Sequence, residues 1–180
     1  MVFAHDTEIA LAAAAALVNT VDGDEDLLPD LAALEDFVRS WGWTGGRAYD
    51  QAELRSVREL RPRLRAAWTM SEDEVVRFVN EVLREAGALP QLVRHDGWSW
   101  HLHAISPDAP LADRMIVEAA MALVDVVRSG ELGRLRTCAY PSCDGVVVDL
   151  SRNRSKRFCE SGCGNRAAVA AYRARKAAAT

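Results

Sequence analysis

The four cysteines of the chain all lie between residues 138 and 163. Four residues separate Cys138 from Cys143, fifteen residues follow, and three separate Cys159 from Cys163. Two close pairs around a hairpin-length gap are typical of tetrahedral Zn²⁺, because each pair brings two sulfurs to one side of the ion at about 2.3 Å. Four thiolates leave no open position, so the spacing predicts one structural zinc ion rather than a catalytic one.

Two other interpretations of the cysteines are weaker. As ordinary core thiols they would leave residues 138–180 with few large apolar side chains, and a segment of about 40 residues usually needs a metal or disulfides to fold. As a redox site they would need a two-residue spacing, which neither pair has. Their clustering also argues against a disulfide framework spread through the fold.

Charge is divided unevenly along the chain, although the net charge is only −4. Up to Glu131 there are 12 Lys and Arg against 23 Asp and Glu, whereas from Arg134 onward there are 10 against 3. A basic end on an acidic body predicts that this end meets a polyanion. The candidate nucleic-acid-binding residues are Arg152, Asn153, Arg154, Lys156, Arg157, Arg166, Arg173 and Lys176.

Two of these candidates have a competing role. Arg166 could balance the thiolate charge beside the metal instead of contacting nucleic acid. Asn153, like Asn165, could occupy a turn position that needs a left-handed residue. DNA is the favoured partner, but basic zinc modules also bind RNA, and a zinc-stabilised protein-interaction module is the alternative.

The residues around the cysteines predict the elements that hold them. The stretch CAYPSCDG is a tight knuckle, residues 146–150 a strand, 151–155 a polar turn and 156–158 a short return strand. Cys159 and Cys163 stand four residues apart, so one helical turn can supply both sulfurs. The sequence therefore predicts a treble-clef-like zinc module over residues 138–180, preceded by a linker at 131–137.

Residues 1–130 predict a mainly α domain with one β-hairpin (α+β). Asp30 and the Ser71–Glu74 pair are helix-start signals, and Pro62 is expected to interrupt or kink a helix. An alternating pattern near 89–105 predicts the hairpin, with Asp96-Gly97 as its two-residue turn. Pairing about that turn would place one set of side chains against the helices: Val93, Trp98, Trp100 and Leu102.

The remaining polar residues offer little chemistry. His101 and His103 could form a metal pair, although two solvent-facing histidines are the favoured interpretation. The acidic turn at 22–26 resembles a calcium loop only superficially, so a solvated loop is expected. The five tryptophans could line a ligand pocket, but an aromatic core is favoured. There is no phosphate-binding glycine loop, nucleophile elbow or HExxH motif, so we do not expect an enzyme.

No apolar run reaches the roughly 20 residues that a membrane span needs. The longest run, IALAAAAALV, lacks the basic flank of a secretory signal. We therefore expect a cytoplasmic protein without membrane contact, and the sequence leaves homo-oligomerisation open.

The string CAYPSC…DLSRNRSKRFCESGCGNRAAVAAYRAR resembles the CGNR zinc finger family, whose signature tetrapeptide stands here at Cys163–Arg166. The match covers about residues 136–177, including all four cysteines. The preceding part, with LVNT at 17–20 and a hairpin after several helices, resembles the ABATE domain that commonly precedes this finger. The resemblance implies a stress-linked bacterial transcription regulator. From the basic residues we expect the zinc module to bind DNA, and the N-terminal domain is a candidate sensor of a small ligand.

Overall fold

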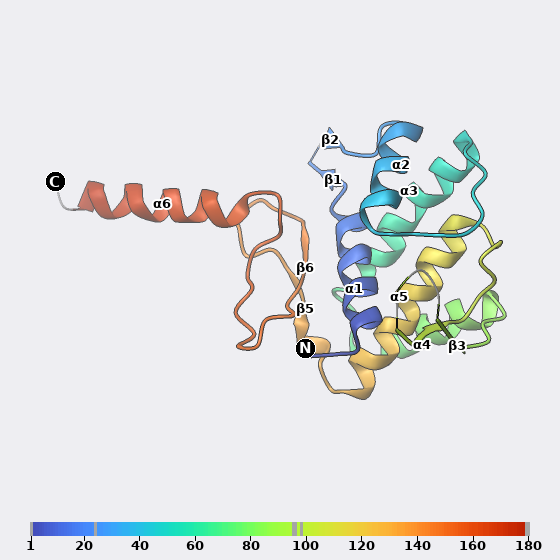
Figure 1. The fold of residues 1–180 in the computed structure, drawn as a ribbon. Helices are drawn as coiled ribbons and strands as arrows, with labels where there is room; N and C mark the ends of the chain where they lie inside the picture. The colour runs from blue at the N-terminus through green and yellow to red at the C-terminus, as the bar shows by residue number, and fades with distance from the viewer. Residues whose placement is uncertain (1, 24, 95–96, 98, 179–180) are drawn as a thin grey trace.

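The computed structural model describes residues 2–23, 25–94, 97 and 99–178. Figure 1 shows a body of packed helices from which a single C-terminal helix projects. The helices are α1 (His5–Val18), α2 (Leu31–Ser40), α3 (Gln51–Ala66), α4 (Glu72–Glu85), α5 (Leu111–Arg128), the 3-10 helix η1 (Leu132–Arg134) and α6 (Cys163–Ala178). The strands form three antiparallel pairs: β1 (Val21–Asp22) with β2 (Glu25–Asp26), β3 (Gln91–Val93) with β4 (His101–His103), and β5 (Leu135–Thr137) with β6 (Val146–Val148). The predicted mainly α fold with a small cysteine-bearing end is confirmed.

Helix α5 forms the centre of the body. It packs against α1, α3 and α4, and its Val117, Ala120 and Val126 have no exposed surface. The alanines of α1 contribute to the same core, among them Ala14 and Ala15. Small side chains on facing helices allow close backbone approach, so the alanine-rich start of the chain is a packing surface.

The helix-start signals are confirmed, and of the two effects expected at Pro62, an interruption or a kink, the interruption does not occur. The Asp30 side chain accepts from Ala33 N at 2.9 Å, and Ser71 and Glu74 form a capping box. Helix α3 continues through Pro62. Proline lacks the N–H that would bond four residues back, and the Arg58 carbonyl accepts instead from Arg61 Nε at 3.3 Å.

The β3–β4 hairpin exists, but its predicted register is off by one residue. Val93 pairs with His101, whereas a two-residue Asp96-Gly97 turn would pair it with Trp100. Because side chains alternate across a strand, this shift exchanges the two faces. Leu102 and Trp100 are exposed, and the buried inward residue is His101, so the predicted apolar face and the solvent-facing histidines are both wrong. Asp96 and Trp98 lie outside the described residues.

Residues 131–137 are not a free linker. They form η1 and β5, and β5 pairs with β6, so the segment predicted as a return strand at 156–158 is not the partner. Leu135, Val146 and Val148 belong to the main hydrophobic core. Figure 1 accordingly shows β5 and β6 between α1 and α6.

The acidic turn at β1–β2 is held by an ion pair rather than solvated throughout. Asp26 forms two contacts with Arg61, at 2.7 and 3.0 Å, and this hydrogen bonding lowers the pKa of Asp26 to about 2. Asp24 and the Asp22 side chain lie outside the described part of the chain. Among the described residues, no helix combines the length and apolarity that crossing a bilayer requires.

Candidate metal centre, basic surface and ligand pocket

The structure brings the four cysteine sulfurs together. All four Sγ atoms lie within 4.8 Å of one another, with Cys143 and Cys159 3.6 Å apart and Cys159 and Cys163 3.5 Å apart. Four sulfurs at about 2.3 Å from one tetrahedral ion would be about 3.8 Å apart. The donor set and its spacing therefore fit a closed thiolate site for a single metal ion.

Different elements supply the sulfurs. Cys138 directly follows β5, Cys143 ends the knuckle, and Cys163 is the first residue of α6. Cys159 lies before α6, so the expectation that one helical turn supplies both sulfurs is wrong; a turn over residues 160–162 intervenes. A Cβ at Gly145 would lie 3.1 Å from Cys159 Sγ and 3.3 Å from Asn19 Oδ1, so any larger residue would require the cluster or the body to shift by a few tenths of an ångström.

The polar surroundings of the cluster favour negative charge on sulfur. Cys159 N donates to Cys138 Sγ, and Gly145 N donates to Cys143 Sγ, each at 3.4 Å. Burial opposes ionisation of Cys138, but backbone N–H donors outweigh it and lower its pKa to about 7. Burial raises the pKa of Cys143 to about 12, with the neighbouring thiols adding to the effect. A cation among the four sulfurs would favour ionisation of all four thiols together.

Arg166 lies against the cluster. Its Nη2 is 2.8 Å from Cys163 Sγ, and its guanidinium stands 5.0 Å from the centre of the Tyr140 ring. Of the two roles weighed for this residue, the structure favours the one beside the thiolates. The arginine adjacent to the last cysteine thus compensates sulfur charge and joins α6 to the knuckle.

The other predicted nucleic-acid contacts fall into two groups. Arg154 pairs with Glu131 at 2.8 Å and Lys156 with Glu160 at 3.0 Å. Arg154 also takes the left-handed conformation of the turn, with φ 51°, rather than Asn153. We define the basic surface as the remaining exposed cations of the module: Arg152, Arg157, Arg173, Arg175 and Lys176.

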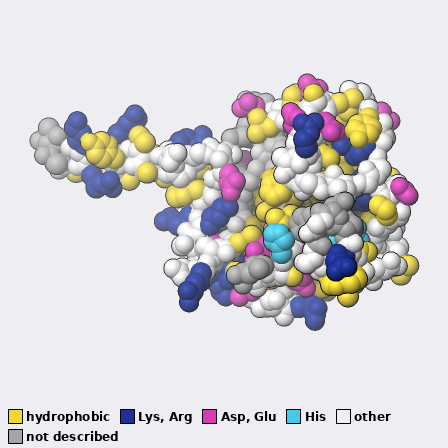
Figure 2. Space-filling model, in the orientation of Figure 1, with side chains coloured by type: hydrophobic (Ala, Val, Ile, Leu, Met, Phe, Trp, Pro, Cys, Tyr) yellow, Lys and Arg dark blue, Asp and Glu magenta, His cyan; other side chains and the backbone are white. Residues whose placement is uncertain are grey.

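Arg175 was missed by sequence reasoning, although it is an arginine of the same basic segment as Arg173. Figure 2 shows Lys and Arg side chains along the projecting helix and the module beside it, whereas most Asp and Glu side chains in this view lie on the body. The charge division read from the sequence is therefore also a division in space. Nucleic-acid contact by these side chains stays a prediction.

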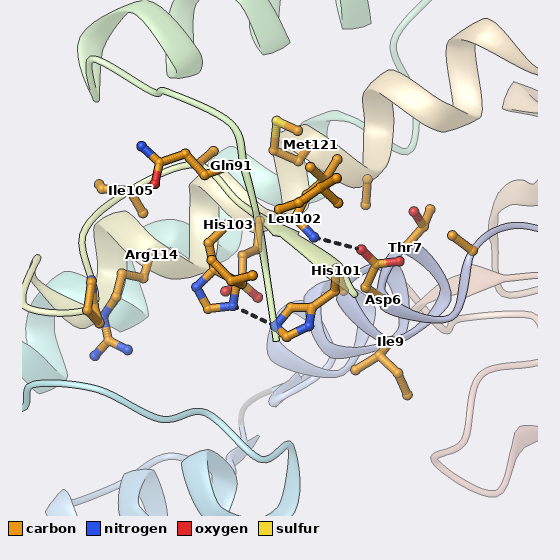
Figure 3. A pocket seen from close by; sticks show the side chains of 18 of the residues that line it. Asp6, Thr7, Ile9, Gln91, His101, Leu102, His103, Ile105, Arg114 and Met121 are labelled. Carbon is orange, nitrogen blue, oxygen red and sulfur yellow. Dashed lines mark hydrogen bonds between the residues drawn. The ribbon is translucent and has the colours of Figure 1, made fainter. Parts of the chain in front are cut away.

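A large cavity opens in the body, between α1, the loop after α2, the β3–β4 hairpin and α5. Its volume is about 1140 Å³. Apolar side chains form much of its wall. The charged or titratable lining residues in the described part of the chain are Asp6, His101, His103, Arg114, Glu118, Asp125 and Arg128. Figure 3 shows His101 and His103 directed toward each other beside Asp6 and Arg114. Trp41, Trp43 and Trp100 are in the lining, so these tryptophans are not purely core residues.

The helix α1 connects this cavity to the cysteine module. Its first half lines the cavity through Asp6 and Thr7, and Asn19 follows its last turn. Asn19 Nδ2 donates to the Val146 carbonyl at 2.8 Å, and Val146 N donates to Asn19 Oδ1 at 2.7 Å. Trp68 Nε1 donates to the Val147 carbonyl at 3.0 Å, so the body holds β6 at successive residues.

Comparison with known proteins assigns both parts of the chain. A family model described as "CGNR zinc finger" matches residues 134–176, and one described as ABATE, "Putative stress-induced transcription regulator", matches residues 11–130. No curated protein matches the chain. Since the second match spans well over half of the sequence and the first covers the cysteine cluster, the chain belongs to the ABATE family and ends in a CGNR zinc finger.

Proposed function

We propose that the protein is a cytoplasmic, DNA-binding transcription regulator with one structural Zn²⁺, whose helical body senses a small ligand. The four clustered sulfurs carry the zinc assignment, because a closed tetrathiolate site suits structural zinc. We propose that the protein is not an enzyme. The metal would be held by Cys138, Cys143, Cys159 and Cys163, and would fix the start of α6.

The part of the basic surface that lies on α6 supports the proposal of DNA binding. This helix has 16 residues, about 24 Å at 1.5 Å per residue, and of its described side chains only Cys163 is buried. A free helix of this kind has the diameter that the major groove admits. Arg173 and Arg175 are exposed along it, and Arg152 and Arg157 extend the positive charge onto the module. Phosphate contacts from such side chains would set affinity and orientation.

The test is the salt dependence of DNA binding by the full-length, zinc-loaded protein. Each lost phosphate contact lowers the slope of log K against log salt by about one unit. We expect Arg173→Ala and Arg157→Ala each to do so, and Arg154→Ala to have less effect because Arg154 already pairs with Glu131. Arg63→Ala, which removes an exposed body arginine paired with Glu85, is the matched control and should leave the slope unchanged.

One observation favours the alternative, an RNA-binding or protein-interaction module. Val169 and Tyr172 of α6 are 48% and 61% exposed, and such side chains can stack on bases or pack against a protein. Selection from a random DNA pool with RNA as competitor separates these functions. Enrichment of a DNA sequence supports the proposal, whereas displacement by RNA or binding that ignores salt contradicts it.

The ligand-sensing part of the proposal is supported by the path from cavity to module. Asp6 and Thr7 line the cavity on the same helix that Asn19 extends to β6. A ligand that shifts α1 would therefore act on the strand that leads to the cysteine cluster. Coupling of this kind is measured by comparing DNA affinity with and without ligand.

A further inference from the structure

The cavity in the body has a charge pattern that selects among ligand classes. Among the described residues, three carboxylates line it, those of Asp6, Glu118 and Asp125. Two arginines also line it, but Arg128 is exposed to solvent. The remaining positive group inside, Arg114, therefore decides whether the cavity suits an anion.

Arg114 is already committed to the protein. It is 5% exposed, and its Nε donates to the Ala109 carbonyl at 3.0 Å. Its two terminal nitrogens donate to the carbonyls of Thr44 and Gly46, so the guanidinium ties the loop after α2 to α5. An anionic ligand would have to compete with these bonds. The arginine is thus a structural clamp rather than an anion receptor.

The three carboxylates differ in what they already bind. Asp125 accepts from the Thr7 hydroxyl at 2.6 Å, and Asp6 accepts from Leu102 N at 3.3 Å. Glu118 accepts no hydrogen bond and forms no ion pair within 4.0 Å among the described residues. Burial raises the pKa of Glu118 to about 7, against the opposing charge of Arg114. Glu118 is therefore the carboxylate that lacks a donor.

The two histidines form a pair of their own. His101 Nδ1 lies 2.8 Å from the Ser99 carbonyl, which can only accept, so this nitrogen carries a proton. In the neutral ring His101 Nε2 then accepts from His103 Nε2–H, at 3.1 Å. Their nitrogens and the surrounding carboxylates are not gathered for a metal, since among the described residues only the cysteines form such a cluster.

We propose that this cavity binds an organic cation, an apolar body bearing one protonated amine whose N–H groups donate to the Glu118 carboxylate. The apolar wall accommodates the body of the ligand, and the ammonium supplies the donor and the positive charge that Glu118 lacks. A charge-assisted hydrogen bond in a shielded site is among the stronger polar contacts a pocket can offer. The inference rests on the ligand-sensing part of the proposed function and names its ligand class.

Direct binding to the full-length, zinc-loaded protein tests the ligand class. The probes are 2-phenylethylamine and tryptamine, each with its matched alcohol (2-phenylethanol, tryptophol) and carboxylate (3-phenylpropanoate, indole-3-propanoate). Calorimetry at pH 8 should show the amines binding about tenfold or more tightly than the alcohols, and the carboxylates binding least. Equal or tighter binding of the carboxylates, or binding of none of the amines, would overturn the proposal.

The variant Glu118→Gln tests the assigned residue. It should weaken amine binding by about tenfold to a hundredfold and leave the alcohols unchanged, because only the charged contact is lost. Glu81→Gln on the exposed face of α4 is the matched control and should change neither. Unaltered amine affinity in Glu118→Gln would refute the assignment. DNA affinity is measured separately without any probe, so failure of the ligand claim and failure of DNA binding are distinguished.

The pH dependence of stability gives a readout that needs no ligand. The pKa of Glu118 is about 7 in the folded protein, whereas its ordinary value is 4.5. Between these pH values the folded state therefore binds more protons than the unfolded state. Stability contributed by this group is therefore present below about pH 4.5 and lost as pH rises through 7. Arg114 on α5 and Asp6 on α1 act on its charge. The other charged or titratable groups of the described residues lining the same cavity are Asp125 and Arg128 on α5 and His101 and His103 on β4.

We expect ligand-free Glu118→Gln to melt several degrees above the wild type at pH 8 and at the same temperature at pH 4.5. The amines should narrow this difference at pH 8, because they bind the wild type about tenfold to a hundredfold more tightly than the variant and so raise its melting temperature more. An identical melting temperature of variant and wild type at pH 8 would mean that Glu118 is well solvated, and would contradict the proposal.

Discussion

The β5–β6 hairpin and helix α6 belong to one zinc module, yet they are held by different parts of the protein. Val146 and Val148 of β6 are buried in the main core. Helix α6 has a single buried residue among those described, Cys163 of the sulfur cluster. The hairpin is therefore held by the helical body, whereas we expect the helix to depend on the proposed metal. Packing against the body thus holds one half of the module, the hairpin, and we expect metal coordination to hold the other half, α6. The sequence alone indicates a single unit.

Metal removal should produce the largest difference between the two halves of the module. Chelation or Cys163→Ser should abolish the helicity of α6, because a 16-residue helix without tertiary contacts is marginal in water and structural zinc contributes about 10 kcal/mol or more to folding. The β5–β6 hairpin should stay folded. Hydrogen exchange would show unprotected amides in α6 and protected ones at residues 146–148. Exposed Ser161→Ala is the control, and loss of protection throughout the hairpin would show that the metal holds both halves.

The Asn19 contact should give the next largest effect. Asn19→Ala removes both partners of the Val146 backbone and leaves its N–H and carbonyl unsatisfied, at a cost of about 2–4 kcal/mol in the free energy of unfolding. Urea denaturation of the full-length protein measures it. Asn80→Ala on the exposed face of α4 should change stability by less than about 0.5 kcal/mol. Equal effects of the two variants would mean that β6 is not anchored by α1.

A pair of valine truncations compares the two halves directly. Val148→Ala deletes buried methyl groups and should cost about 1–3 kcal/mol, whereas Val169→Ala on α6 should cost less than about 0.5 kcal/mol because that side chain is 48% exposed. Both are measured by thermal and urea unfolding with zinc present. A larger effect at Val169 would reveal a partner surface for α6.

The smallest expected effect concerns two tryptophans. Trp68→Phe removes the bond to the Val147 carbonyl and should cost about 1 kcal/mol beyond the loss of ring volume. Trp43→Phe is the matched comparison, because Trp43 Nε1 is buried without a hydrogen-bond partner. Differential scanning calorimetry should therefore show the larger drop for Trp68→Phe. A larger drop for Trp43→Phe would mean that the Trp68 hydrogen bond does not help to anchor β6.

The cysteine cluster could be predicted from sequence because short cysteine spacings constrain geometry locally. The same is true of the Asp30 cap and the Ser71–Glu74 capping box. The register of the β3–β4 hairpin could not be predicted, because one extra residue between the two strands moves each side chain of β4 to the opposite face. The Asp96-Gly97 dipeptide in the sequence gives no sign of this extra residue. The alternation around His101 was therefore assigned to the wrong side.

The docking of β5 was missed for a different reason. Gly130, Gly133 and the change of charge sign indicated a boundary, yet Leu135 lies in the core and pairs with Val148 across the ribbon. The ligand cavity had no local signature either. Its walls come from α1, the loop after α2, the hairpin and α5, and only tertiary packing places Glu118 among them.

The docked hairpin also limits how this finger can be exchanged between proteins. Cutting the chain at residue 130, where its charge changes sign, would leave Leu135, Val146 and Val148 exposed on one fragment. The other fragment would expose the side of α1 and α3 where Asn19 and Trp68 receive β6. A transplant would therefore have to carry a matching α1 with it. Recombination within the family is expected to preserve the body and the hairpin together.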